Sequence, residues 1–64
     1  MRLTELHARL ASRLGTEYAD SWSRDFVLSQ LGERTVVDAL AAGYDAVVVW
    51  RAAADALGVP PGER

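Results

Sequence analysis

Side chains that can act as an acid, a base or a nucleophile are few in this sequence of 64 residues. The single histidine, His7, forms a Ser/His/Asp set on paper with Ser12 and Asp20. Such a set needs a nucleophile held at a strained turn and a loop that binds the oxyanion, and no such motif accompanies Ser12. The sequence therefore predicts a protein that is not an enzyme.

Metal and cofactor sites find no support in the same residues. The chain has no cysteine, and one histidine cannot supply the two or three ligands that most zinc sites need. The glycines stand alone rather than in a run that would cradle a phosphate. We expect no metal, no cofactor and no disulfide.

Arginine supplies all seven basic side chains, and Arg2, Arg9 and Arg13 fall within about 40° of one another on a helix. This Arg strip is a candidate for contacting phosphate groups. The charge balance instead favours a solvated face with ion pairs, because residues 1–34 carry five arginines and five acids, and residues 35–64 carry two arginines and four acids. Nucleic-acid-binding domains are usually clearly basic, whereas the net charge here is −2.

The fold that must position these side chains is predicted to be all-α. Thr4, Thr35 and Asp45 precede three helical stretches as candidate N-caps, and single glycines follow them. Residues 1-58 are predicted to form one domain, followed by a frayed tail over 59-64. The expected architecture is a small bundle of four short helices at about 5-14, 17-29, 36-42 and 46-57.

Apolar residues recur every three or four positions within these helices and define the predicted core. Eleven residues of the chain are alanine, which favours closely packed helices. The predicted core consists of Leu6, Leu10, Leu14, Trp22, Phe26, Leu31, Val36, Leu40, Val49, Trp50, Ala53 and Leu57.

Three consecutive valines precede Trp50, and β-branched runs of this kind also suit strands. We favour a helix, because Asp45 is a helix cap, alanines follow the valines and no second strand candidate is present. With the Trp50 side facing the core, Val48 points outward, whereas the alternative is that the valines pack against the first helix. The candidate partner surface, in which Tyr44 is expected to be exposed, is Val47, Val48, Tyr44 and Arg51.

These features predict a non-catalytic protein-interaction or regulatory module with an unidentified protein partner. The alternative is a nucleic-acid-binding regulator, because the two helices within residues 35-57 have the spacing of a helix-turn-helix. The second of them carries only Arg51 as a side chain suited to contact bases, and it lies in the acidic half of the chain. A protein partner is therefore favoured over nucleic acid.

No apolar run is long enough for the hydrophobic part of a signal peptide or for a membrane span. The expected setting is the cytoplasm, and no membrane partner is expected.

Short stretches spread over about residues 1 to 60 combine into one pattern. The most specific are the Arg34-Thr35 pair and the run Val49-Trp50-Arg51-Ala52. The others are Met1-Arg2-Leu3-Thr4, Tyr18, Ser21-Trp22, Arg24-Asp25, Val27-Leu28, Leu31, Ala39-Leu40, Gly43 and Val59-Pro60. Together they resemble the small actinobacterial proteins of domain-of-unknown-function family 3046.

The resemblance implies a short, cytosolic, helical protein in a DNA recombination or repair context, and it implies no established activity. Two positions depart from the family pattern. Phe26 stands where a histidine is frequent, which argues against chemistry by a family histidine here. Val47 and Val48 stand where charged residues are usual, which argues against one shared role for the outer face of the fourth helix.

Overall fold

The computed structural model describes residues 1–64 and contains four α-helices and two short 3-10 helices, with no strand. The all-α architecture of four helices predicted from the sequence is confirmed. No helix is both long enough and apolar enough to cross a membrane. In chain order the elements are α1 (Leu3–Leu14), α2 (Thr16–Asp25), η1 (Ser29–Leu31), α3 (Val36–Ala41), α4 (Ala46–Leu57) and η2 (Pro61–Glu63).

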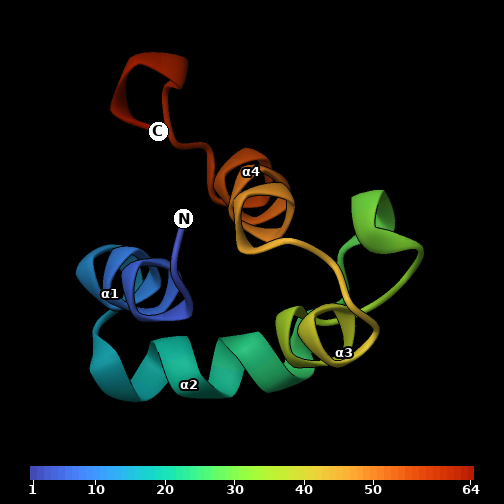
Figure 1. The fold of residues 1–64 in the computed structure, drawn as a ribbon. Coiled ribbons are helices and arrows are strands. Elements are labelled where there is room, and N and C mark those ends of the chain that lie inside the picture. Colours follow the sequence, from blue (N-terminus) through green and yellow to red (C-terminus); the bar gives the residue numbers. More distant parts are fainter.

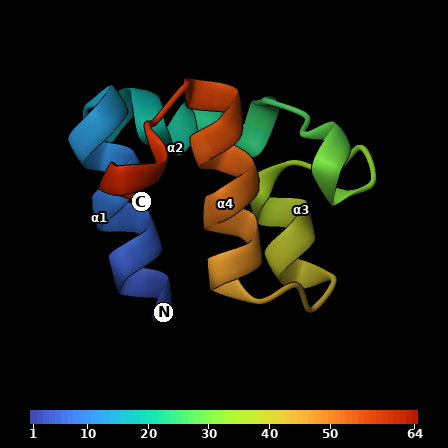
Figure 2. The same ribbon diagram turned by 90° about the horizontal axis from the view of Figure 1, so that it is seen from above.

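The helices close a ring around one core. Helices α1, α4 and α3 lie side by side, and α2 runs across α1 and α3 (Figures 1 and 2). Each helix contacts two others, because α1 packs against α2 and α4, and α3 packs against the same two helices. Helix α4 runs in the same direction as α1 and opposite to α3 (Figure 2). The end of the chain, beyond α4, contacts Arg9 and Arg13 of α1.

The first two helices are separated only by Gly15, whose φ of 85° favours glycine. Its N–H donates to the Ala11 carbonyl and ends α1. The predicted N-cap at Thr4 was wrong, because α1 begins two residues after Met1 with Arg2 at the cap position, and Thr4 lies within its first turn. Leu6 and Leu10, one turn apart, are fully buried and fix the inward face of α1.

Helix α2 ends at Asp25, so the predicted continuation to residue 29 was wrong. Phe26 is already extended, at φ −83° and ψ 119°. The Leu28 N–H donates to the Arg34 carbonyl at 2.9 Å instead of to the preceding helical turn. Leaving the helix lets Leu28 and Leu31 both reach the core. The hydrogen bond between Leu28 and Arg34 thus replaces the helical hydrogen bond that the apolar periodicity of this segment predicted.

The second half of the chain follows the prediction closely. Thr35 caps α3, its Oγ1 accepting from the Asp38 N–H at 3.1 Å, and α3 ends one residue before the predicted end. Helix α4 has the predicted bounds, so the three valines are helical and the strand alternative is wrong. Asp45 occupies the N-cap position of α4 but makes no side-chain capping bond.

The core contains most of the predicted residues. Leu14, Leu40 and Leu57 are half-buried at its edge, and Phe26 is outside it, with 44% of its surface exposed. Phe26 still stacks on Trp22, with ring centroids 5.0 Å apart. Five of the fourteen buried apolar residues are alanine, which allows close helix approach. The core is Leu6, Leu10, Ala19, Trp22, Leu28, Leu31, Val36, Ala39, Val49, Trp50, Ala52, Ala53, Ala54 and Val59.

The structure differs from the frayed tail expected over 59-64. Val59 is only 2% exposed, and its N–H donates to the Ala54 carbonyl at 2.9 Å. The chain then forms η2 and returns over α1, so that Arg64 lies within hydrogen-bond reach of Arg9 (Figure 2). Val59 buries its side chain beyond the last helix, and Arg64 bonds to the Val59 carbonyl, Asp55 and Arg9, so the end of the chain lies against the fold.

Candidate functional site

The outer face of α4 carries part of the predicted partner surface. Val48 is 41% exposed, and Arg51 follows it one turn later, also exposed. Arg51 forms none of the ion pairs or side-chain hydrogen bonds within the chain. Val47 lies on another side of the helix and is half-buried. The structure therefore brings Val48 and Arg51 together and separates Val47 from them.

Tyr44 is half-buried and packs against the core, whereas the sequence predicted it to be exposed. Its hydroxyl accepts from Arg34 Nη1 at 3.2 Å, and the Arg34 guanidinium lies 5.5 Å from its ring centroid. The same Nη1 also donates to the Leu31 carbonyl at 3.1 Å. Tyr44 is therefore held by Arg34, in the loop that follows η1.

Beside α4 lies a groove of about 340 Å³ that the sequence did not predict. Phe26 and Val27, which are 44% and 49% exposed, line it from the segment between α2 and η1. Ala52 and Ala56 line it from α4, and Ala52 lies one turn after Val48 on the same face. We name it the α2–α4 groove, because its residues come from the segment that follows α2 and from α4. It is lined by Phe26, Val27, Leu28, Ser29, Gln30, Ala52, Asp55 and Ala56.

Sequence reasoning missed this groove because it placed Phe26 in a continuous helix and in the core. The extended backbone at Phe26 and Leu28 turns two large apolar side chains toward solvent. The signal in the sequence is the pair Phe26-Val27, an aromatic followed by a β-branched residue, which suits extended backbone better than a helix.

The predicted Arg strip is not a free basic surface. Arg9 Nη1 donates to the Arg64 main-chain oxygen at 2.8 Å, and its guanidinium lies 5.5 Å from the Trp50 ring centroid. Arg13 pairs with Glu63 at 3.2 Å. Only Arg2 is exposed without such a partner. The strip is divided because the end of the chain, distant in sequence, folds onto two of its three members.

Asp55 joins the end of the chain to η1. It accepts from Gln30 Nε2 at 3.0 Å and pairs with Arg64. The hydrogen bond from Gln30 and then the contact with Arg64 hold the pKa of the Asp55 carboxyl below its ordinary value. The charged form is favoured because both neighbours donate to it.

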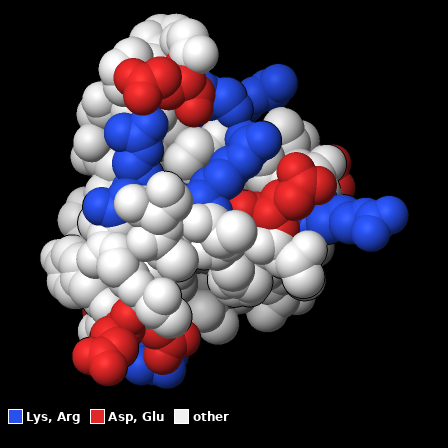
Figure 3. Space-filling view, turned by 90° about the vertical axis from the view of Figure 1, so that its left-hand side faces the viewer, with Lys and Arg blue, Asp and Glu red and all other residues white.

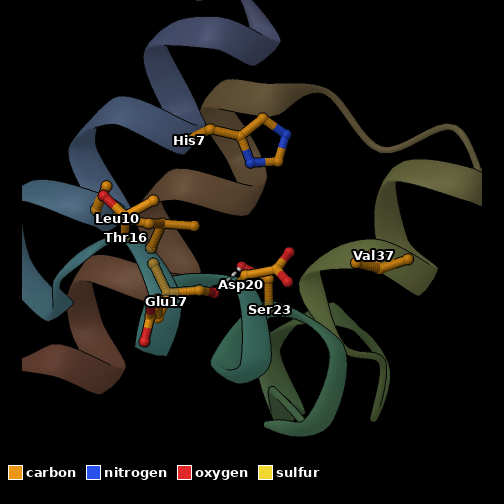
Figure 4. Close-up of a pocket in the computed structure, with 9 residues that line it drawn as sticks. His7, Leu10, Thr16, Glu17, Asp20, Ser23 and Val37 are labelled. Atoms are coloured by element: carbon orange, nitrogen blue, oxygen red, sulfur yellow. Dashed lines mark hydrogen bonds between the residues drawn. The ribbon is translucent and has the colours of Figure 1, made fainter.

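A second hollow, of about 430 Å³, lies between α1, α2 and α3 (Figure 4). His7 of α1 and Asp20 of α2 both reach its opening, and Val37 of α3 stands across from them. Ser12 lines a different pocket, so the structure does not assemble the Ser/His/Asp set. Asp20 is paired with Arg24 at 2.9 Å. No group of three or more His, Cys, Asp or Glu side chains is placed to hold a metal ion.

The most specific stretches of the sequence have structural roles. Arg34 bonds the loop and Tyr44, and Thr35 caps α3. In the run from Val49 to Ala52 every residue is buried except Arg51. Arg51 is therefore the one member of these stretches whose side chain is left for contact with something outside the chain.

Comparison with known proteins gives one match. No curated protein and no solved structure matches the chain. A family model described as a protein of unknown function matches residues 1–62. The chain therefore belongs to the family DUF3046, as the Arg34-Thr35 pair and the Val49-Trp50-Arg51-Ala52 run had indicated.

Proposed function

We propose that this protein is a non-catalytic protein-interaction module that binds its partner along the α2–α4 groove and the outer face of α4. The observation that carries the proposal is the exposure of Phe26 and Val27 in the groove and of Val48 on the outer face of α4, three of the seven large apolar side chains that are exposed. Grouped apolar exposure on a small protein is typical of a partner surface. We propose the cytoplasm as its setting, as expected from the sequence.

The groove has the features of an anchor site for one or two apolar side chains. Phe26 and Val27 line it from one side and Ala52 and Ala56 from the other. Ser29, Gln30 and Asp55 add polar side chains to the lining, and Gln30 Nε2 donates to the Asp55 carboxylate at 3.0 Å. The alanines leave room beside the larger residues, and Leu28 beneath them is buried. An aromatic or aliphatic side chain of a partner would bury Phe26 and Val27, and such anchors dominate the energetics of protein interfaces.

Charge adds a second requirement on the partner. Arg51 is exposed beside Val48 and is unpaired within the chain. The carboxylate of Asp55, at the same side of α4, is already occupied by Gln30 and Arg64. The partner is therefore expected to carry an acidic residue next to its apolar anchor, because a carboxylate would pair with the Arg51 guanidinium.

The experiment is site-specific photo-crosslinking in host cells. A photoreactive residue is placed at Val27 and, separately, at Val48, with Tyr18 as the matched control. Tyr18 is also apolar and is 59% exposed, and it lines none of the pockets. We expect the same protein to be crosslinked from positions 27 and 48 and not from position 18. Equal labelling from all three positions would contradict the proposal.

The alternative function, nucleic-acid binding through the helix pair α3 and α4, has weaker support. Helix α3 spans only Val36–Ala41, and the exposed face of α4 offers one cation, Arg51, near the Asp55 carboxylate. Arg9 and Arg13 are engaged by the end of the chain. This alternative predicts salt-dependent DNA binding that weakens when Arg9 and Arg13 are both changed to alanine.

A further inference from the structure

The backbone that lines the α2–α4 groove between α2 and η1 is extended. Phe26 has a φ of −83° and a ψ of 119°, and Leu28 has a φ of −109° and a ψ of 115°. The Leu28 N–H donates to the Arg34 carbonyl oxygen at 2.9 Å, and these two residues form an isolated antiparallel bridge. One edge of this extended segment is therefore already paired in the manner of a β-strand.

The other edge has no partner within the chain. The N–H and the carbonyl oxygen of Val27 make no hydrogen bond to a backbone or side-chain group, and the Ser29 N–H makes none either. Successive residues of extended backbone direct their N–H and C=O groups to opposite edges. Because Leu28 points its N–H at Arg34, Val27 and Ser29 point theirs away from it. The result is a short strand edge with two unpaired donors and one unpaired acceptor.

Apolar side chains flank this edge. Phe26 and Val27 are 44% and 49% exposed, and Ala52 and Ala56 of α4 line the same groove. An extended partner segment laid along Val27 would cover both large side chains and bond to the backbone between them. A partner helix would cover the same side chains, but its own backbone groups are already bonded internally. It would shield the Val27 donor and acceptor from water without a hydrogen bond, which costs free energy.

The charged side of the molecule differs from this edge. Figure 3 shows basic and acidic side chains close together on the side formed by α1 and the end of the chain. Arg13 pairs with Glu63 there, and Arg64 pairs with Asp55. These side chains bond within the chain, whereas the backbone of Val27 does not.

We propose, resting on the function proposed above, that the protein partner binds this groove as an extended segment that adds a strand along Val27. A backbone N–H of the partner donates to the Val27 carbonyl oxygen, and a partner carbonyl accepts from the Val27 N–H. The segment around Val27 then becomes the middle strand between the partner and Arg34. Unpaired strand edges are templates for such pairing. Backbone hydrogen bonds supply the affinity, and the contacts with Phe26 and Val27 supply the specificity.

The first test removes the Val27 N–H. Val27→Pro breaks no hydrogen bond within the chain, and Phe26 already has the extended conformation that a residue before proline adopts. We expect the variant to keep the helical circular dichroism and the urea unfolding midpoint of the parent. Its affinity for the protein that is crosslinked from both Val27 and Val48 is expected to fall about tenfold, because a partner carbonyl loses its donor.

Val27→Ile is the matched control, because it keeps both the N–H and a β-branched apolar side chain, and it is expected to bind as the parent does. Parent-like affinity in the Val27→Pro variant, or equal weakening in the proline and isoleucine variants, would overturn the added strand. Either result leaves the groove itself to stand or fall with Val27→Ser and Val48→Glu, so the two proposals fail separately.

A second measurement needs no change at position 27. With different isotope labels in the two proteins, NMR detects a scalar coupling across a hydrogen bond from the Val27 nitrogen to a carbonyl carbon of the partner. We expect this coupling, together with nuclear Overhauser effects between the Val27 amide proton and backbone protons of the partner. Saturable shifts at the Phe26 and Val27 side chains without either signal would show that the partner docks through side chains alone, which would overturn the added strand.

Discussion

Arginines that look equivalent in the sequence have different roles in the fold. Arg9 and Arg13 hold the end of the chain, Arg34 holds Tyr44 and the η1 loop, and Arg2 and Arg51 are exposed without a partner in the chain. Spacing along a helix predicts which side chains share a face, and it correctly grouped Arg9 with Arg13. Spacing could not predict their partners, because Glu63 and Arg64 lie about fifty residues away along the chain.

Thr35 caps α3, as the sequence predicted, and the strength of this cap can be tested. Thr35→Ala removes the side-chain acceptor of the Asp38 N–H and is expected to lower the free energy of unfolding by about 1 kcal/mol. Thr35→Ser keeps a hydroxyl at the cap and is the control, expected to stay within about 0.5 kcal/mol of the parent. Urea unfolding followed by circular dichroism measures both variants. Equal stability of the parent and the Ala variant would show that the cap contributes nothing.

Asp55 gives a prediction on pH. Its pKa is lowered in the folded chain chiefly by Gln30, so Gln30→Ala is expected to raise that pKa toward the ordinary value of 3.8. NMR titration of the Asp55 carboxyl measures the change directly. A carboxyl whose pKa is the same in the Gln30→Ala variant would show that the hydrogen bond from Gln30 has no effect.

The same shift has a consequence for stability, and its sign follows from linkage. Because the folded pKa lies below the unfolded one, the Asp55 contacts stabilise the fold above pH 3.8, and this contribution is lost as the pH falls through the folded pKa. The stability of the parent is therefore expected to converge on that of an Asp55→Asn variant as the pH falls. A difference between the two that does not shrink on acidification would contradict the assignment.

At the scale of elements, local signals and long-range pairings predict different parts of the fold. Helix α4 was predicted with its observed bounds because Asp45 and Gly58 flank it and nothing else competes for its residues. The end of α2 was predicted wrongly because it depends on the pairing of Leu28 with Arg34. Phe26 and Val27 line the α2–α4 groove because α2 ends at Asp25 and not at residue 29 as predicted. The helical periodicity of the sequence therefore could not predict this groove.

Val59 gives a prediction for the end of the chain. Val59→Ala removes two methyl groups from a site that is 2% exposed and is expected to cost about 2 kcal/mol of unfolding free energy. Val27→Ala makes the same chemical change at a side chain that is 49% exposed, and it is expected to cost less than about 1 kcal/mol. Equal losses in the two variants, measured by urea unfolding, would show that the end of the chain is not anchored by Val59.

At the scale of the whole molecule, the arginines of α1 and the apolar side chains of the proposed partner surface lie on different elements. The end of the chain engages two of the three arginines of the predicted strip, which leaves no basic stripe. The exposed apolar side chains Phe26, Val27 and Val48 instead border one groove and one helix face. The net charge of −2 favours a protein partner over nucleic acid. The pairing of Arg9 and Arg13 within the chain supports the same preference.

The most direct test of the interaction surface is the dissociation constant between this protein and the protein that is crosslinked from both Val27 and Val48. Isothermal titration calorimetry would compare Val27→Ser and Val48→Glu with the matched control Tyr18→Ser. We expect the two groove-side variants to bind at least about tenfold more weakly than the parent and the control to bind as the parent does. Parent-like affinity in both groove-side variants would contradict the assignment of this surface.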